Sequence, residues 1–132
     1  MRLYSTVLQL ASLVFFAVAG LHLVLGVGAD QMLGAVLSPA TITEPSLDSQ
    51  NRFYGVAFAF YGVALFTCAS DLRRFRPILV AALAVFFLAG CARLVSWALR
   101  GAPAPLVMGL MAAEIALPPV LYVWLRRVSP VS

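Results

Sequence analysis

Residues 77–99 read PILVAALAVFFLAGCARLVSWAL, and Arg93 is the single charged residue in this stretch. A bilayer core of ~30 Å is crossed by a helix of about 20 predominantly apolar residues. A charged side chain at that depth costs about 3 kcal/mol on insertion scales, so it normally has a partner or a function. The stretch therefore predicts a transmembrane helix whose arginine needs a compensating group.

Three further apolar segments, residues 5–28, 53–70 and 105–125, have similar lengths. The whole chain is 63% hydrophobic and only 11% charged, which lies outside the composition of soluble domains. We predict an all-α integral membrane protein, a four-helix transmembrane bundle that forms a single domain over residues 1–132. Its spans are expected at about 5–28, 53–70, 77–99 and 105–125, with a long outer loop at 29–52.

The arginines indicate how the spans are oriented. One side carries six of them, namely Arg2, Arg73, Arg74, Arg76, Arg126 and Arg127. The opposite side carries Arg52 and Arg100 together with three acidic residues. Because positive charge is enriched in cytoplasmic segments, both termini are predicted in the cytoplasm. Arginines at span ends account for the net charge of +4, and no nucleic-acid partner is expected.

Two features of the first half of the chain leave alternatives open. Arg2, an apolar run and Ala17-Val18-Ala19 imitate a cleaved signal peptide, but the run continues well past that site to Val27. The long loop is either a solvated connector or includes a short interfacial helix within residues 31–37. Asp48 is placed to cap the second span.

Glu114 is the charged residue of the fourth span. The tight turn at residues 100–104 makes spans three and four antiparallel neighbours, with an axial offset of about 4–5 Å between Arg93 and Glu114. An Arg93–Glu114 ion pair is therefore expected. Pro118 and Pro119 deprive the carbonyls of Glu114 and Ile115 of their helical partners. They predict either a purely structural kink or acceptors at a binding site.

Three more polar residues fall at the same level in the outer half of the membrane. His22 lies on the polar arc of the first span, and Asn51 and Arg52 open the second. With Arg93 and Glu114 they form a candidate ligand-binding cluster, because ionisable groups gathered inside a membrane commonly serve a site. The alternatives are a packed, hydrogen-bonded His22 and an Arg52 that sits among lipid head groups.

Catalytic and metal-binding motifs are missing from the sequence. A single histidine cannot supply a His-rich metal site or bis-His haem ligation. Cys68 and Cys91 form no CxxC motif and are expected near opposite membrane faces, too far apart for a disulfide. No nucleophile–base pair is visible, so no catalytic residue, metal or cofactor is assigned.

Four strings in the chain resemble a known bacterial family. They are LDSQNRFYG at 47–55, GCAR at 90–93, GAPAP at 101–105, and Glu114 before Pro118. In this order they are similar to the membrane family called domain of unknown function 4345. The resemblance implies a multi-pass, four-helix protein of the bacterial inner membrane and implies no activity. A looser similarity in size and helix number links the chain to DoxX-like membrane proteins.

The polar cluster is compatible with three classes of function. The first is a non-catalytic protein that binds membrane lipids or a quinone-like amphiphile, or an accessory subunit of a larger membrane complex or homo-oligomer. The second is an enzyme on a lipid-soluble substrate, with His22 and Glu114 transferring protons. The third is a small proton-coupled transporter that uses Glu114. Small multidrug exporters carry such a carboxylate on the first helix, whereas Glu114 is on the fourth.

Overall fold

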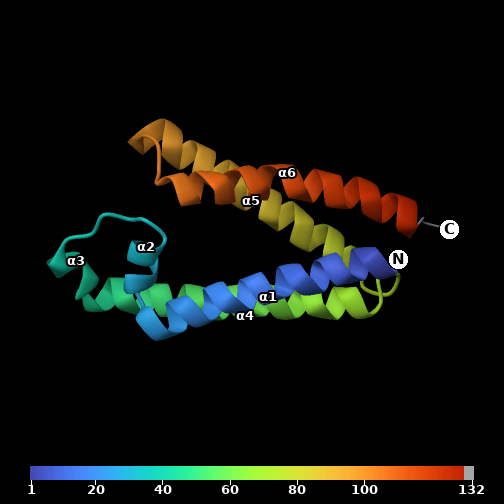
Figure 1. The fold of residues 1–132 in the computed structure, drawn as a ribbon, viewed down its shortest axis with the longest axis horizontal. Helices are drawn as coiled ribbons and strands as arrows, with labels where there is room; N and C mark the ends of the chain where they lie inside the picture. The colour runs from blue at the N-terminus through green and yellow to red at the C-terminus, as the bar shows by residue number, and fades with distance from the viewer. Residues whose placement is uncertain (130–132) are drawn as a thin grey trace.

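The computed structural model describes residues 1–129, and every regular element in them is a helix (Figure 1). The order is α1 Arg2–Leu25, α2 Gly28–Met32, α3 Pro39–Ile42, α4 Pro45–Ser70, α5 Arg76–Arg100 and α6 Pro105–Val128. Of these, α1, α4, α5 and α6 are long and apolar enough to cross a membrane. The predicted all-α class and its four span-length helices are confirmed.

The second long helix starts earlier than the sequence pattern predicted. Helix α4 begins at Pro45 rather than at Phe53, because Glu44 is its N-cap and accepts a hydrogen bond from the Leu47 N–H at 2.7 Å. The same backbone N–H, followed by that of Ser46, holds the pKa of Glu44 below its ordinary value of 4.5. Asp48, the expected cap, instead lies in the first turn.

The expected outer loop at 29–52 is correspondingly shorter and more ordered. It contains the short helices α2 and α3 as well as the first two turns of α4. Helix α2 covers Gly28–Met32 and not residues 31–37. Helix α3 is capped by Ser38, whose hydroxyl accepts from the Thr41 N–H at 3.2 Å.

The four long helices form two antiparallel pairs. Helix α1 packs along α4, and α5 packs along α6, while contacts between the pairs are fewer. Figure 1 shows the pairs meeting at the end that holds the N-terminus and the last turn of α6, which we call the terminal end. They diverge towards the end that holds α2 and α3, which we call the loop end.

Glycines allow the close approach within each pair. A Cβ atom at Gly55 of α4 would lie 3.0 Å from the carbonyl oxygen of Ala19 on α1, and one at Gly62 would lie 2.9 Å from the Phe16 ring. At Gly90 of α5 it would lie 2.7 Å from Ile115 of α6. Small residues at these positions let the backbones pack closely, as is typical of helices in lipid.

The terminal end contains the buried core and the polar ties between the pairs. The Tyr4 hydroxyl donates to Leu121 O at 3.1 Å, the Tyr61 hydroxyl donates to Ala82 O at 2.5 Å, and the Arg76 guanidinium donates to Ser129 O. The buried apolar core lies around them: Tyr4, Leu8, Leu65, Cys68, Ala69, Leu72, Leu79, Ala82, Leu83 and Leu125. The hydrogen bonds and the buried core that join the two pairs therefore lie towards the terminal end, while at the loop end Gly34 lies so close to Ala104, the N-cap of α6, that an added Cβ would be 2.9 Å from the Ala104 Cβ.

Candidate functional site

Arg93 and Glu114 form the expected ion pair. Arg93 Nε donates to Glu114 Oε2 at 2.7 Å, from α5 to the neighbouring α6. The pair forms beside Gly90, where a Cβ would come within 3.0 Å of the Glu114 Cβ. The Glu114 side chain is 9% exposed, whereas the Arg93 side chain is 38% exposed. The carboxylate is therefore held inside the α5–α6 pair while part of the guanidinium stays accessible.

The helical phase of α5 shows which way Arg93 faces. At 3.6 residues per turn, Ala82, Phe86 and Arg93 fall within about 40° of one another. Ala82 accepts the Tyr61 hydrogen bond, and the Phe86 ring lies 5.6 Å from that of Phe15. Both contacts go to the α1–α4 pair. Arg93 is therefore on the α5 face that is turned towards the other pair of helices.

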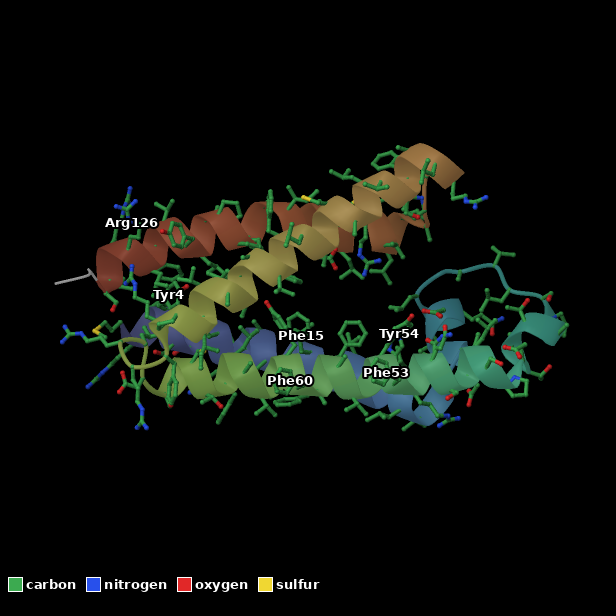
Figure 2. All side chains as sticks on the ribbon, turned by 180° about the vertical axis from the view of Figure 1, so that it is seen from behind. Tyr4, Phe15, Phe53, Tyr54, Phe60 and Arg126 are labelled. Atoms are coloured by element: carbon green, nitrogen blue, oxygen red, sulfur yellow. The ribbon has the colours of Figure 1, made fainter. Side chains whose placement is uncertain are left out.

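Four aromatic rings close the space between the pairs near mid-length. Phe15 lies 4.5 Å from Tyr61, 5.6 Å from Phe86 and 6.4 Å from Phe58, measured between ring centroids. Phe15 and Phe58 come from the α1–α4 pair, as does Tyr61, and only Phe86 comes from α5. We call these four residues the aromatic cluster; beyond it the pairs diverge (Figure 2, where Phe15 is labelled).

The residues seven positions further towards the loop end share these faces. On α1, His22 follows Phe15 by seven residues, and on α5, Arg93 follows Phe86 by seven. Helix α4 runs in the opposite direction to α1, so there the corresponding residue is Tyr54, seven positions before Tyr61. A shift of seven residues changes the helical phase by only about 20° and moves about 10 Å along the axis. His22, Tyr54 and Arg93 therefore lie at one level, and Figure 2 shows Tyr54 on the side of α4 that faces the α5–α6 pair.

Two side chains at this level are only partly covered. Tyr54 is 48% exposed and Arg93 is substantially exposed, although both lie on faces that are turned towards the other pair. On corresponding faces at the terminal end, Leu65 and Leu79 are buried. We call the region around Tyr54 and Arg93, on the loop-end side of the aromatic cluster, the loop-end opening.

His22 is supported by its own surroundings. Its Nδ1–H donates to Val18 O at 2.9 Å, and its ring lies 5.2 Å from that of Phe58. The Nδ1 donation leaves Nε2 directed at the Asp30 carboxylate of α2, 3.8 Å away. His22 is 4% exposed. It is therefore a buried residue that packs beside α2, close to the opening.

Arg52 joins the ends of α1 and α4. Its Nε donates to Asp48 Oδ2 at 2.7 Å and its Nη1 to Leu23 O at 2.6 Å, one of the carbonyls left unpaired at the end of α1. Asp48 itself lies against Gly26, the residue after α1, where φ is +55° and a Cβ would overlap the Asp48 carboxylate. These contacts give Arg52 a role within the α1–α4 pair.

Asn51 is the one predicted site residue with a buried polar side-chain atom that lacks a partner in the described part of the chain. Its Nδ2 makes a long 3.4 Å hydrogen bond to Leu47 O. Its Oδ1 is buried and has no hydrogen-bond partner within residues 1–129. A buried acceptor without a partner is costly. The Asn51 Oδ1 atom could therefore accept a further hydrogen bond at the loop end of the α1–α4 pair.

The five residues grouped by the sequence lie on two separate pairs of helices. Arg93 and Glu114 are on the α5–α6 pair, and His22, Asn51 and Arg52 are on the α1–α4 pair. Among residues 1–129, no hydrogen bond or ion pair connects the two groups.

Two residues of this region, Tyr54 and Asp30, were not among the predicted site residues. The seven-residue spacing between Tyr54 and Tyr61 was the signal that could have identified Tyr54. Asp30 had no such signal, because its approach to His22 depends on where α2 folds back.

Metal ligation finds no support in this arrangement. Across residues 1–129, no three His, Cys, Asp or Glu side chains are close enough to hold an ion. Cys68 and Cys91 are free thiols on α4 and α5.

Comparison with known proteins supplies the family. A protein-family model described as "Domain of unknown function (DUF4345)" matches residues 4–125. No curated protein and no solved structure matches the chain. The matched region contains all four long helices and the four strings on which the resemblance rested. The chain therefore belongs to the DUF4345 family, as a small membrane protein with four candidate spans.

Proposed function

We propose that the protein is a non-catalytic binding protein of the bacterial inner membrane, with both termini in the cytoplasm. Its ligand is a membrane amphiphile, a quinone or a lipid ester, whose carbonyl oxygen accepts hydrogen bonds from Arg93. The ligand enters the loop-end opening between the two pairs of helices.

The proposal rests on the Arg93 guanidinium, most of whose N–H donors have no acceptor within residues 1–129. An arginine has five N–H donors, and within residues 1–129 the Nε–H is the one that has an acceptor, Glu114. The four Nη hydrogens remain on a side chain that is 38% exposed, two turns before the end of the apolar helix α5. Unmet donors at membrane depth are expensive, and a ligand oxygen would satisfy them.

Because both arginines are already paired with carboxylates, the site favours a neutral or weakly acidic head group. Glu114 already compensates Arg93, and Asp48 compensates Arg52, at 2.7 Å in both cases. A second full negative charge would be placed beside the buried Glu114 carboxylate, where repulsion is weakly screened. A carbonyl group uses the Nη donors without this cost.

The walls of the opening suit the rest of such a molecule. The aromatic cluster lies about 10 Å from Arg93 along the helix axes and offers ring faces and edges for stacking. Tyr54 adds a phenol at the level that the seven-residue spacing gives for Arg93. An aromatic or unsaturated head group would lie between these rings and Arg93, with its apolar chain in the surrounding lipid.

Proton transfer by His22 and Glu114 receives less support. Glu114 is engaged by Arg93, and the Nδ1–H of His22 is engaged by Val18 O. A proton-coupled transporter would need the same carboxylate to be released in each cycle. Binding requires no change in either contact.

Replacement of Arg93 tests the proposal. The wild type and the Arg93→Gln variant are purified gently, and their extracted lipids and quinones are quantified by mass spectrometry. We expect the wild type to retain a near-stoichiometric carbonyl-bearing amphiphile and Arg93→Gln to lose most of it. Arg93→Lys should retain a part, because lysine keeps the charge but not the planar set of donors.

Arg100→Gln is the matched control, since Arg100 ends the same helix and is exposed. It should keep the ligand at the wild-type level. The proposal is wrong if Arg93→Gln lowers thermal stability and leaves the bound material unchanged. Recovery of a stoichiometric protein partner in place of an amphiphile would favour an accessory subunit.

A further inference from the structure

We propose that a second, independent site at the terminal end binds the phosphate-bearing head group of an anionic phospholipid. It is the hollow between the first turns of α1 and the turn that joins α4 to α5. Its wall includes Arg2, Ser5, Asp71, Leu72 and Arg73. Its volume is about 700 Å³, within the range of about 300–1,000 Å³ that is common for ligand sites.

Neither arginine of the hollow forms an ion pair within residues 1–129. The ion pairs within residues 1–129 are His22–Asp30, Arg52–Asp48 and Arg93–Glu114, all away from this hollow. Arg2 and Arg73 therefore offer two unneutralised guanidinium groups. Guanidinium groups form paired, charge-assisted hydrogen bonds with phosphate oxygens.

Asp71 is the acidic residue in the wall, and its carboxylate is used locally. Its Oδ1 accepts from the backbone N–H groups of Arg73 at 3.1 Å and Arg74 at 3.0 Å. These bonds shape the turn between α4 and α5 and hold that oxygen against the backbone. The hollow thus keeps a positive balance although it includes a carboxylate.

The remaining arginines at this end are differently placed. Arg76 donates to Ser129 O, and the Arg74 guanidinium lies 5.3 Å from the centre of the Phe75 ring. Figure 2 shows Arg126 extending from α6, away from α1. None of these three lines the hollow. The site is therefore defined by two particular arginines and not by the general excess of positive charge.

A lipid head group fits this position better than a free phosphate ion. The hollow lies where α1 begins and α4 ends, at the boundary of two candidate spans. Leu72 and Met1 give part of the wall an apolar character, and Leu3 beside them is exposed. A phosphodiester would contact Arg2 and Arg73 while its acyl chains follow the exposed apolar surface of α1.

Lipid-dependent stability tests this site. The protein is placed in nanodiscs of phosphatidylcholine, with or without phosphatidylglycerol, and its thermal unfolding is followed. Arg2→Gln/Arg73→Gln is compared with Arg74→Gln/Arg126→Gln, which removes the same charge at the same end. We expect phosphatidylglycerol to raise the unfolding temperature of the wild type and of the control. The site variant should lose most of that shift and retain less phosphatidylglycerol in native mass spectrometry.

Several outcomes would overturn the proposal. These are no shift in the wild type, an equal loss of shift in both double variants, or an equal shift with inorganic phosphate in phosphatidylcholine nanodiscs. If the site variant does not fold, Arg2→Lys/Arg73→Lys replaces it. That variant keeps the charge, and it should bind less phosphatidylglycerol than the wild type and more than Arg2→Gln alone.

Discussion

Arg93 and Glu114 show how a single charged residue is accommodated inside an apolar helix. The carboxylate is almost fully enclosed, and the guanidinium is bonded to it at one edge and accessible at the other. Each charge offsets part of the desolvation cost of the other. Together they are not expected to stabilise the fold more than two apolar residues would. Under the proposed function, the free edge of Arg93 would bind the ligand while Glu114 compensates its charge.

A double-mutant cycle measures this dependence. Glu114→Met should destabilise by about 3 kcal/mol, and Arg93→Met by about 3–5 kcal/mol, because each leaves an uncompensated charge. The cost of Arg93→Met is the larger, since the Glu114 left behind is the more buried partner. The double variant should cost much less than the sum, as measured by denaturant unfolding in mixed micelles. Additive single effects would show that the two side chains do not interact.

Among the helices, glycine positions decide how closely the members of each pair approach. Gly90 lies against the backbone and side chains of Glu114 and Ile115, so it sets the spacing of α5 and α6 at the level of the ion pair. At Gly109 on α6, an added Cβ would meet no other atom within 4 Å. The two glycines therefore have different structural roles on the same pair of helices.

Gly90→Ala should destabilise the protein by about 1–3 kcal/mol, because the added methyl forces α5 and α6 apart. The same variant should weaken the Arg93–Glu114 bond and reduce retention of the amphiphile. Gly109→Ala is the control and should leave stability unchanged or slightly raised, since alanine favours the helix. Equal thermal stability of the two variants in detergent would contradict the close approach at Gly90.

Across the molecule as a whole, the two pairs are tied at the terminal end and separate at the loop end (Figure 1). Tyr4, Tyr61 and Arg76 bond to carbonyls across the junction, and the buried core surrounds them. The aromatic cluster bridges the pairs near mid-length, where the Phe86 ring of α5 lies 5.6 Å from that of Phe15 and 6.0 Å from that of Tyr61. Arg93 lies on α5 beyond this junction, and its side chain is 38% exposed.

Reporter fusions test the orientation of this arrangement. Reporters after Arg74 and Arg127 should be cytoplasmic, and one near Glu44 should be external, because six arginines lie at the terminal end. The loop-end opening would then face the outer half of the membrane. An external reporter after Arg127 would contradict the predicted orientation and would place the opening in the inner half.

Local patterns in the amino-acid sequence were sufficient to predict the helices and their ion pair. Length and apolar content identified the four span-length helices, because the bilayer sets a fixed length for any helix that crosses it. The tight turn at 100–104 and the constant rise of a helix predicted that Arg93 would reach Glu114. The early start of α4 was missed because Glu44-Pro45 is a capping signal of two residues within a polar stretch.

Which helices pair, and where the pairs separate, depends on tertiary packing and could not be read from those patterns. In lipid, surfaces that face protein and surfaces that face acyl chains are both apolar, so hydrophobicity does not identify a helix's neighbours. The choice depends on side-chain volumes, on glycines that allow close approach of a neighbouring backbone, and on aromatic rings that contact each other between the pairs. For that reason His22, Asn51 and Arg52 lie with α1 and α4, while Tyr54 joins Arg93 at the opening.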